Sequence, residues 1–496
     1  MIGHRFAPVL RELQPLTDRF AAAGHRLFLV GGTVRDLLLA DQGDDRVVDR
    51  DLAIDDDFDI DATTTAHPAQ IKQCLQGWAD AVWTQGERFG TIAAMKRVPS
   101  TSPAALPGQM IDRVYEITTH RAEAYQGHSR KPTVEFSLDI HADLSRRDFT
   151  VNAMAIELTA NPVDGHPAGL GTGTAEPVMI DPVVIDPFGG RTDLTDRVLR
   201  TPLGPEASFS DDPLRMLRAA RFIARYRLQP DAALLRAVRS MGDRMQIVSA
   251  ERIRDELGKL LAAPLPGDGL QFVARTGLLQ HVVPELVAAV SQTDESCHAH
   301  LWDHTVALVD AVRHPDQLHR FQRPLVRLAA LLHPLGATKA RARLLTLRHA
   351  NDESRDVVGL IELLTPLLVR LVQQHEPWTD GEVRRHVHAA GRLLHELHEL
   401  VRAEGRVHTG TIALRLTDGL RTLQARIDDM AQNEPLHDLG PQIDGAQVMA
   451  MLGVGPGRAV GQALAFLTEV RLDEGVLASS DLQIRLEEWW NNHVEK

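Results

Sequence analysis

Residues 55–68 read DDDFDIDATTTAHP, and acidic side chains are unusually dense in this stretch. Polar and apolar residues alternate through its first half, which predicts a strand over 57–61. Asp59 and Asp61 would project from one face of that strand with Cα atoms about 6.5–7 Å apart, while the apolar residues face a core. Two carboxylates so placed can bind one or two divalent cations. The acidic residues that precede Phe58 and Ile60, including Asp55, are expected to be exposed. The alternative interpretation is an edge strand that its acidic residues keep soluble.

A second motif lies upstream, in LFLVGGTVRDLLL at residues 27–39. The apolar run predicts a strand over 27–31, and a helix is expected over 33–40. Paired glycines allow close backbone approach, and a helix N-terminus offers N–H groups to an anion, so Gly32 is a candidate phosphate-binding residue. Arg35 adds a guanidinium fork suited to phosphate. Together with the acidic strand, this turn predicts a triphosphate site beside a metal site.

The order of these motifs resembles the class II tRNA nucleotidyltransferase and poly(A) polymerase family, within the DNA polymerase β superfamily. GGTVRD and DIDATT carry the resemblance first. The further segments are GERFGTI (86–92), YEITTHRAEAY (115–125), RRDFTVNAMAIEL (146–158), IDPFGGRTDL (185–194), DDPLRMLRAARF (211–222) and SAERIRDELGKLL (249–261). WTDGEVRRHVHAAG and VRLDEGVL, nearer the C-terminus, resemble the actinobacterial CCA-adding branch. The matching segments extend over almost the whole chain.

The resemblance implies a multidomain α+β fold. A polymerase-β-like nucleotidyltransferase head with a mixed sheet would precede an all-α C-terminal half. The expected divisions are a head at 1–160 with its core from about 25, a Gly/Pro-rich loop insertion at 161–190, a helical neck at 191–265 and a helical body and tail at 266–496.

Local patterns predict further elements of the head. Strands are expected over 91–95, 113–119 and 133–137, and a helix over 66–77. Thr64 or Thr65 would cap this helix, with Pro68 in its first turn.

Composition agrees with an intracellular RNA enzyme of several domains. The chain has 496 residues, 44% of them hydrophobic, and two cysteines, which is typical of a reducing cytoplasm. No signal peptide or membrane-spanning run is recognisable. The net charge of −13 is unfavourable for binding RNA. Because arginines cluster at 200–254, we expect a local basic stripe rather than a basic protein.

The segment at 211–222 places charged side chains at intervals of three. On a helix, adjacent members of such a row are neighbours but the row slants around the axis. Asp212 and Arg215 can therefore face one object while Arg221 points largely elsewhere. The alternative is a salt-bridge ladder. The resemblance implies that Asp212 and Arg215 act as a protein template for the incoming nucleotide, with Arg218 and Arg221 also in the nucleotide site.

An Asp–Arg pair can select bases by hydrogen bonding. Cytosine and adenine present an amino donor next to a ring-nitrogen acceptor, whereas a carboxylate only accepts and a guanidinium only donates. Guanine and uracil present a carbonyl and a ring N–H instead. One such pair therefore accepts C and A and rejects G and U. The family usually has Glu where Asp211 stands, which leaves the pair itself intact.

Two other segments supply candidate site residues. By resemblance, Arg147 contacts the nucleotide, and Asp148 with Asn152 helps hold the sugar region; alone these residues would be interpreted as a surface salt bridge and a cap. Glu116 is either a third acid near the metal or an ordinary outward-facing strand residue.

The function implied by the resemblance is template-independent addition of C, C and A to the 3′ end of tRNA. Asp59 and Asp61 would bind the Mg²⁺ cofactor, and the RNA 3′-hydroxyl would attack the α-phosphate of CTP or ATP. The helical half would bind the acceptor end of tRNA. The alternatives are poly(A) addition, addition of only A or only CC, and a non-catalytic RNA-binding relative.

Residues from about 298 to 345 resemble an HD phosphohydrolase domain. That domain binds metal through an adjacent His-Asp pair, whereas here His333 is followed by Pro334, which has no ligand atom. His300 and His304 could share a helix face, but two histidines without an acid make a poor site. We therefore expect a degenerate HD region without phosphohydrolase activity.

Overall fold

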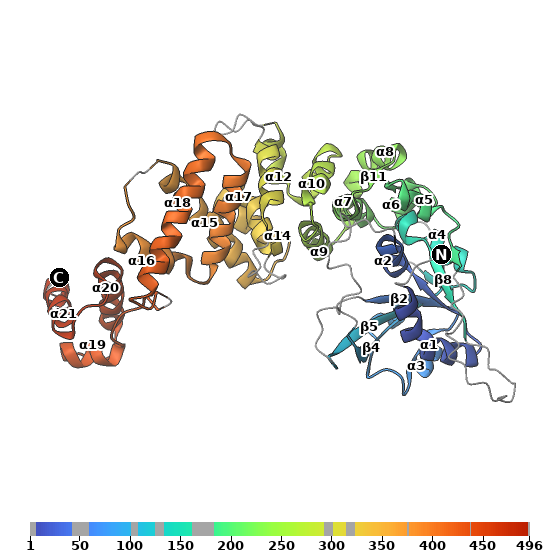
Figure 1. The fold of residues 1–496 in the computed structure, drawn as a ribbon, viewed down its shortest axis with the longest axis horizontal. Coiled ribbons are helices and arrows are strands. Elements are labelled where there is room, and N and C mark those ends of the chain that lie inside the picture. Colours follow the sequence, from blue (N-terminus) through green and yellow to red (C-terminus); the bar gives the residue numbers. More distant parts are fainter. Residues whose placement is uncertain are drawn as a thin grey trace, which may run out of the picture. The chain divides into compact units, whose positions relative to one another are not determined.

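The structure is a computed structural model in which the chain forms two compact units (Figure 1). Unit 1 comprises Met1–Ser249 and Ala263–His281, and unit 2 comprises Ala250–Ala262 and Val282–Lys496. The residues described are 6–41, 59–100, 108–124, 133–160, 183–291, 301–313, 323–373, 376–436 and 438–494. Asp55, His300 and most of the Gly/Pro-rich insertion lie outside them. Among the described helices, none is long and apolar enough to cross a membrane.

Unit 1 is built on a mixed seven-stranded sheet with the order β3-β4-β5-β2-β1-β8-β9. β2 and β5 are parallel, and the other neighbours are antiparallel. Every residue of β1 is buried, which explains its uninterrupted apolar sequence. The strands of this sheet are β1 Leu27–Val30, β2 Ile60–Thr64, β3 Ala81–Trp83, β4 Thr91–Pro99, β5 Met110–Thr119, β8 Ala155–Leu158 and β9 Val184–Ile185. Two smaller sheets pair β6 Arg121–Ala124 with β7 Thr133–Phe136 and β10 Val198–Leu199 with β11 Gln229–Pro230.

The acidic strand begins later than the sequence predicts. In this stretch the described residues start at Asp59. β2 runs from Ile60 to Thr64, whereas the sequence predicts a strand over 57–61. All of β2 pairs with β5, and its residues 62–64 also pair with β1 on the other side, which extends the strand to Thr64. The predicted alternation holds where it can be followed: Ile60 is buried, Asp59 is exposed and Asp61 is half-buried.

The predicted cap of the next helix is wrong. α3 spans Pro68–Leu75 and its N-cap is His67, not Thr64 or Thr65. The Thr64 hydroxyl donates instead to the carbonyl of Arg26, because Thr64 is part of the sheet. Pro68 does lie in the first turn, as predicted.

Helices cover the sheet and continue beyond it in unit 1. α2 starts at Gly31, immediately after β1, so the chain turns from strand to helix without a loop. The helices are α1 Phe6–Ala22, α2 Gly31–Asp41, α3 Pro68–Leu75, α4 Ile140–Ser145, α5 Gly190–Thr195, α6 Pro205–Asp211, α7 Leu214–Tyr226, α8 Ala232–Met241, α10 Pro266–Arg275 and α11 Leu279–Val282.

The described residues of unit 2 form helices and short 3-10 turns, which confirms the predicted all-α C-terminal half. The helices are α9 Ala250–Leu261, α12 Leu301–Ala311, α13 Arg323–Leu332, α14 Gly336–Thr346, α15 Asn351–Gln373, α16 Asp380–Ala390, α17 Leu394–Val407, α18 Gly410–Ala431, α19 Gly445–Leu452, α20 Arg458–Glu474 and α21 Ser479–Val494. α9 belongs to unit 2 and α10 to unit 1, whereas the sequence suggested a division after residue 265.

The turn of the IDPFGGRTDL segment explains its paired glycines. The Asp186 carboxylate accepts from the backbone N–H groups of Gly190 at 2.7 Å and Arg191 at 2.9 Å. A Cβ on Gly190 would lie 2.2 Å from the carbonyl oxygen of Thr150. α5 therefore packs closely on the 3-10 turn Thr150–Asn152, which only glycine permits at this contact.

Gly190→Ala is expected to destabilise the protein by about 3 kcal/mol or more, because backbone must move to admit the methyl group. Gly189→Ala is the matched control. Its φ is +73° but a Cβ there would meet nothing within 4 Å, so only the conformational cost of about 1–2 kcal/mol applies. Urea unfolding of both variants measures the difference. Equal losses would show that the contact with Thr150 relaxes freely.

Candidate active site

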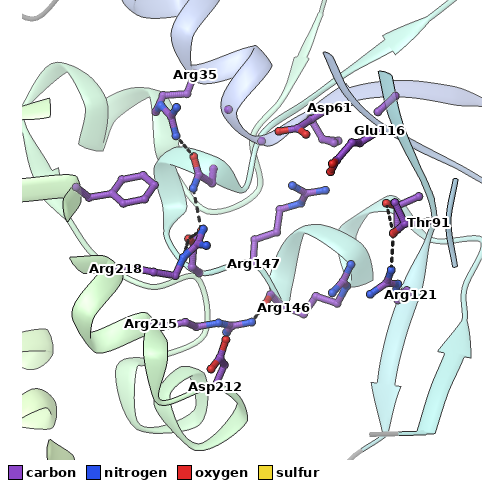
Figure 2. Close-up of a pocket in the computed structure, with 18 of the residues that line it drawn as sticks. Arg35, Asp61, Thr91, Glu116, Arg121, Arg146, Arg147, Asp212, Arg215 and Arg218 are labelled. Atoms are coloured by element: carbon purple, nitrogen blue, oxygen red, sulfur yellow. Dashed lines mark hydrogen bonds and ion pairs between the residues drawn. The ribbon is translucent and has the colours of Figure 1, made fainter. Parts of the chain in front are cut away.

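A cavity of about 520 Å³ opens in unit 1, a volume that suits a small ligand (Figure 2). Charged side chains dominate its lining, with seven arginines against four carboxylates. The arginines are Arg35, Arg121, Arg146, Arg147, Arg215, Arg218 and Arg221, and the carboxylates are Asp61, Glu116, Asp148 and Asp212. The expected local excess of positive charge is therefore present in a chain that is acidic as a whole. A polyanion is the ligand that this excess favours.

Two carboxylates form one edge of the cavity. Asp61 on β2 and Glu116 on β5 are register partners, and adjacent strands lie about 4.8 Å apart. Both side chains point into the cavity, so the structure places Glu116 beside Asp61 (Figure 2). Asp59 is exposed and is not among the lining residues, although its charge raises the pKa of Asp61. The structure thus brings one predicted ligand and the uncertain third acid together in the cavity.

The pKa of Asp61 responds to several neighbouring groups. Burial raises its pKa, and the positive charges of Arg147 and Arg35 oppose that rise. The N–H of Gly32 also hydrogen-bonds to the carboxylate, and the N–H of Asp61 donates to the Thr33 hydroxyl at 2.8 Å. The first turn of α2 therefore fixes both the backbone and the side chain of Asp61.

Close approach requires glycine at the first position of that turn, whereas the second position has ordinary contacts. Gly31 has a φ of +64°, and a Cβ there would lie 2.9 Å from Arg147 Nη1 and 3.3 Å from Asp61 Oδ2. A Cβ on Gly32 would lie 3.4 Å from Arg35 Nη2. Any side chain at Gly31 would displace the charged groups at the mouth of the cavity.

Arg35 is buried rather than extended toward solvent. It is 6% exposed, and its guanidinium donates to both carboxylate oxygens of Asp36 and to Asn152 Oδ1. It also lies 4.2 Å from the ring centroid of Tyr226. Its side chain reaches the cavity wall, but these contacts also make it a structural link between α2 and α7.

Asp148 is the centre of a buried polar network. Its Oδ1 accepts from Asn152 Nδ2 and from the N–H of Phe149, both at 2.9 Å. Its Oδ2 accepts from Arg218 at 2.6 Å. Burial alone would raise the pKa of Asp148, but Arg218 and Asn152 hold it well below its usual value. Since Asn152 also accepts from Arg35, one chain of contacts joins α2, the 3-10 turn and α7.

Several members of the row of charges at 212–221 have partners outside their own helix. Asp212 precedes α7 and accepts from the N–H of Leu214 at 3.1 Å. Arg215 donates to Ser208 Oγ at 2.9 Å and to the carbonyl of Arg146 at 2.6 Å. Arg215 and Arg218 therefore bind partners on other elements, and Asp212 and Arg215 line one cavity.

The expected orientation of Arg221 is wrong. It lines the same cavity as Arg215 and Arg218 instead of pointing elsewhere. Three arginines at intervals of three span about one third of a helical turn, and their length lets all of them reach one side. Its guanidinium lies 4.9 Å from the ring centroid of Phe222, another lining residue.

Sequence reasoning missed four polar lining residues: Thr91, Thr118, Arg121 and Arg146. The Thr91 and Thr118 hydroxyls lie 2.9 Å apart, and Arg121 Nη2 donates to Thr91 Oγ1 at 2.9 Å. Thr118 follows Glu116 by two positions, so strand periodicity alone would have placed both on one face. The signal for the others was their position inside segments that carry the family resemblance.

Comparison with known proteins bears on this cavity. Residues 27–200 match the poly(A) polymerase head domain, and residues 227–290 match a probable RNA- and SrmB-binding site of polymerase A. The chain is 32% identical over 269 residues to a CCA-adding enzyme of Lactobacillus gasseri, and the match covers 54% of each chain. The chain thus spans about half the length of this relative.

Two further matches extend over more of the chain. It is 29% identical over 429 residues to an A-adding tRNA nucleotidyltransferase of Deinococcus radiodurans, covering 80% of this chain and 91% of that one. A crystal structure of the Bacillus stearothermophilus CCA-adding enzyme in complex with CTP aligns over 98% of this chain and 99% of that one, with a TM-score of 0.67 and 22% identity. This likeness confirms the predicted fold class.

Asp148→Asn is expected to lower the free energy of unfolding at pH 7 by about 1.5–3 kcal/mol, because Arg218 loses a charged hydrogen-bond partner. A carboxylate with a depressed pKa stabilises the fold above its unfolded pKa of about 3.9, and this contribution is lost as the pH falls below that value. The difference in the free energy of unfolding between wild type and variant should therefore be smaller at pH 3 than at pH 7. Urea titrations at both pH values measure it, with exposed Asp196→Asn as the control. A gap that is unchanged or wider at pH 3 would contradict the network.

Proposed function

Because the chain belongs to the tRNA nucleotidyltransferase and poly(A) polymerase family, we propose that it adds C, C and A to the 3′ end of tRNA from CTP and ATP. The observation that carries the proposal is the cavity in which an acidic edge faces a wall of arginines, with Asp212 and Arg215 on the same wall. A nucleoside triphosphate needs those three parts: a site for a divalent cation, positive charge for phosphates and a reader for the base.

The acidic edge fits a magnesium ion, whose preferred ligands in proteins are carboxylate oxygens. Asp61 and Glu116 would bind it, with Asp59 available from the position just before β2. When bound, the ion would neutralise charge that develops on the phosphates. Asp61 is half-buried, and burial raises the pKa of its carboxylate although Arg147 and Arg35 lie nearby.

The arginines of the cavity would bind and orient the triphosphate. Arg147 lies beside Asp61 and donates to Asp143 at 3.1 Å, which fixes its position between the acidic edge and α4. Arg121 is held by Thr91 on the other wall. With the α-phosphate bound near these groups, the oxygen of the RNA 3′-hydroxyl would form a bond to phosphorus and lose its proton to solvent, while the bond from phosphorus to pyrophosphate breaks.

Arg215 would read the base together with Asp212, and contacts within the protein support this role. Its contacts with Ser208 and the Arg146 carbonyl fix the direction of the guanidinium. Asp212 is fixed by the N–H of Leu214. Both groups line the nucleotide cavity, so the pair can accept an amino donor next to a ring-nitrogen acceptor, as in C and A.

The alternatives receive less support. Two of the three similar proteins named above are CCA-adding enzymes, and the third is an A-adding tRNA nucleotidyltransferase. Incubating the chain with tRNA that lacks its 3′ CCA distinguishes them. CCA addition requires incorporation of labelled CTP, followed by ATP. An A-adding enzyme would incorporate ATP into tRNA ending in CC but would not incorporate CTP into tRNA that lacks CCA. Long A tails would indicate a poly(A) polymerase. The cytoplasmic location inferred from composition stays a prediction.

Asp61→Ala and Asp59→Ala are each expected to abolish nucleotide addition while tRNA binding stays nearly unchanged, because RNA affinity depends on cationic residues. Asp55→Ala is the matched control from the same acidic run and should have little effect. Single-turnover addition and filter binding measure the two properties. If Asp55 proved essential and Asp61 dispensable, the assignment of the acidic edge would be wrong.

Arg215→Ala is expected to reduce the efficiency of CTP and ATP incorporation by roughly ten- to over a hundredfold, since a hydrogen bond to a charged group contributes about 1.5–3 kcal/mol. Incorporation of GTP and UTP should fall much less, so the preference for CTP and ATP over GTP and UTP becomes smaller. Single-turnover addition with all four nucleotides measures this, with exposed Arg236→Ala as the control. Equal slowing of all four nucleotides would assign Arg215 a purely structural role.

A further inference from the structure

Unit 2 contains a cluster of three side chains with the donor atoms of a metal site, outside the cavity already described. His304, Glu404 and His408 each offer one ligand atom, and these atoms lie within 4.8 Å of one another. Nε2 of His304 lies 3.1 Å from Glu404 Oε2, and Nε2 of His408 lies 3.4 Å from the same oxygen. Both imidazoles thus point toward one carboxylate.

Helix packing explains this convergence. Glu404 lies in the last turn of α17 and His408 is its C-cap, four positions later on the same face. The N–H of His408 donates to the carbonyl of Glu404 at 3.0 Å, which continues the helical geometry to the cap. His304 lies on α12, which packs against α17. The three ligand atoms therefore come from two packed helices and need no mobile loop.

Burial makes the charge of this cluster costly. Glu404 is 2% exposed and His304 is 5% exposed. Oε2 of Glu404 is a buried oxygen that accepts no hydrogen bond within the part of the chain that the structure describes, although both imidazole Nε2 atoms lie close to it. A buried carboxylate oxygen needs a partner, and a cation held between it and the two imidazoles would supply one.

A fourth imidazole lies close by. The ring centroid of His333 is 6.5 Å from that of His304. His333 Nδ1 lies 2.7 Å from the carbonyl oxygen of Ala330. Because a carbonyl only accepts, Nδ1 carries the proton there. His333 is not one of the three residues whose ligand atoms converge, so it lies beside the cluster rather than in it.

We propose that His304, Glu404 and His408 bind one divalent transition-metal ion of the zinc type. Two imidazoles and a carboxylate suit Zn²⁺, whereas Mg²⁺ prefers oxygen ligands. The ligand set differs from the adjacent His-Asp pair of an HD phosphohydrolase, because Glu404 and His408 supply the later ligands and Pro334 supplies none. The ion would cross-link α12 to α17 and stabilise unit 2, and no hydrolytic role is implied.

This cluster corrects the expectation that His304 lacks an acidic partner. The acid is Glu404, which comes from a helix 100 positions later in the chain. Only the packing of α12 on α17 brings it beside His304.

The test uses the full chain, stripped of metal with a chelator and titrated with Zn²⁺ alone. Wild type is expected to bind one Zn²⁺ per chain and to unfold at a higher temperature when it is bound. Glu404→Gln and His408→Gln should each weaken Zn²⁺ binding at least about 100-fold and remove the thermal shift. His349→Gln is the matched control: His349 Nδ1 lies 2.8 Å from Glu353 Oε2, and among the described residues this pair has no third metal ligand.

Circular dichroism establishes that each variant is folded before titration. His408 is half-buried, so its variant remains informative if Glu404→Gln does not fold. The proposal is overturned if wild type binds Zn²⁺ no more tightly than His408→Gln, or if His349→Gln loses binding to the same extent. Either result would make the cluster a triad of neighbouring side chains only.

Discussion

The ion pair between Asp148 and Arg218 is the interaction on which the architecture of the cavity depends. Asp148 belongs to the segment between α4 and the 3-10 turn, and Arg218 belongs to α7. Asn152 continues the network to Arg35 on α2, the helix whose first turn fixes Asp61. The carboxylate edge on the sheet and the arginines on α7 are thus joined through one buried carboxylate. A charge at that position is tolerated only because every oxygen of Asp148 has a donor.

Much of the head could be predicted because its signals are local. A buried central strand followed by Gly31 and Gly32 and an alternating acidic strand specify strand, turn and helix with residues a few positions apart. The exact bounds of β2 could not be predicted, because they depend on pairing with β1 and β5, which extends the strand to Thr64. Thr64 is therefore part of the sheet and does not cap the next helix. Strand register also placed Glu116 beside Asp61, a relation between residues that periodicity alone cannot fix.

Long-range contacts account for the remaining differences. Arg215 binds the carbonyl of Arg146, 69 positions earlier, and Arg218 binds Asp148, so spacing along α7 said little about their partners. Glu404 likewise meets His304 only through helix packing. Net charge was similarly uninformative: a chain with a charge of −13 places seven arginines around one cavity. Recognition of phosphate requires local rather than overall positive charge.

A double-mutant cycle on Asp148 and Arg218 tests the central claim most directly. The free energies of unfolding of Asp148→Asn, Arg218→Met and the double variant would be measured by urea titration, and CTP affinity would be measured in parallel. The account predicts a coupling energy of about 1–3 kcal/mol, with all three variants weakened in CTP binding. Additivity within about 0.5 kcal/mol, with CTP affinity unchanged, would contradict the claim that this pair joins the two walls of the cavity.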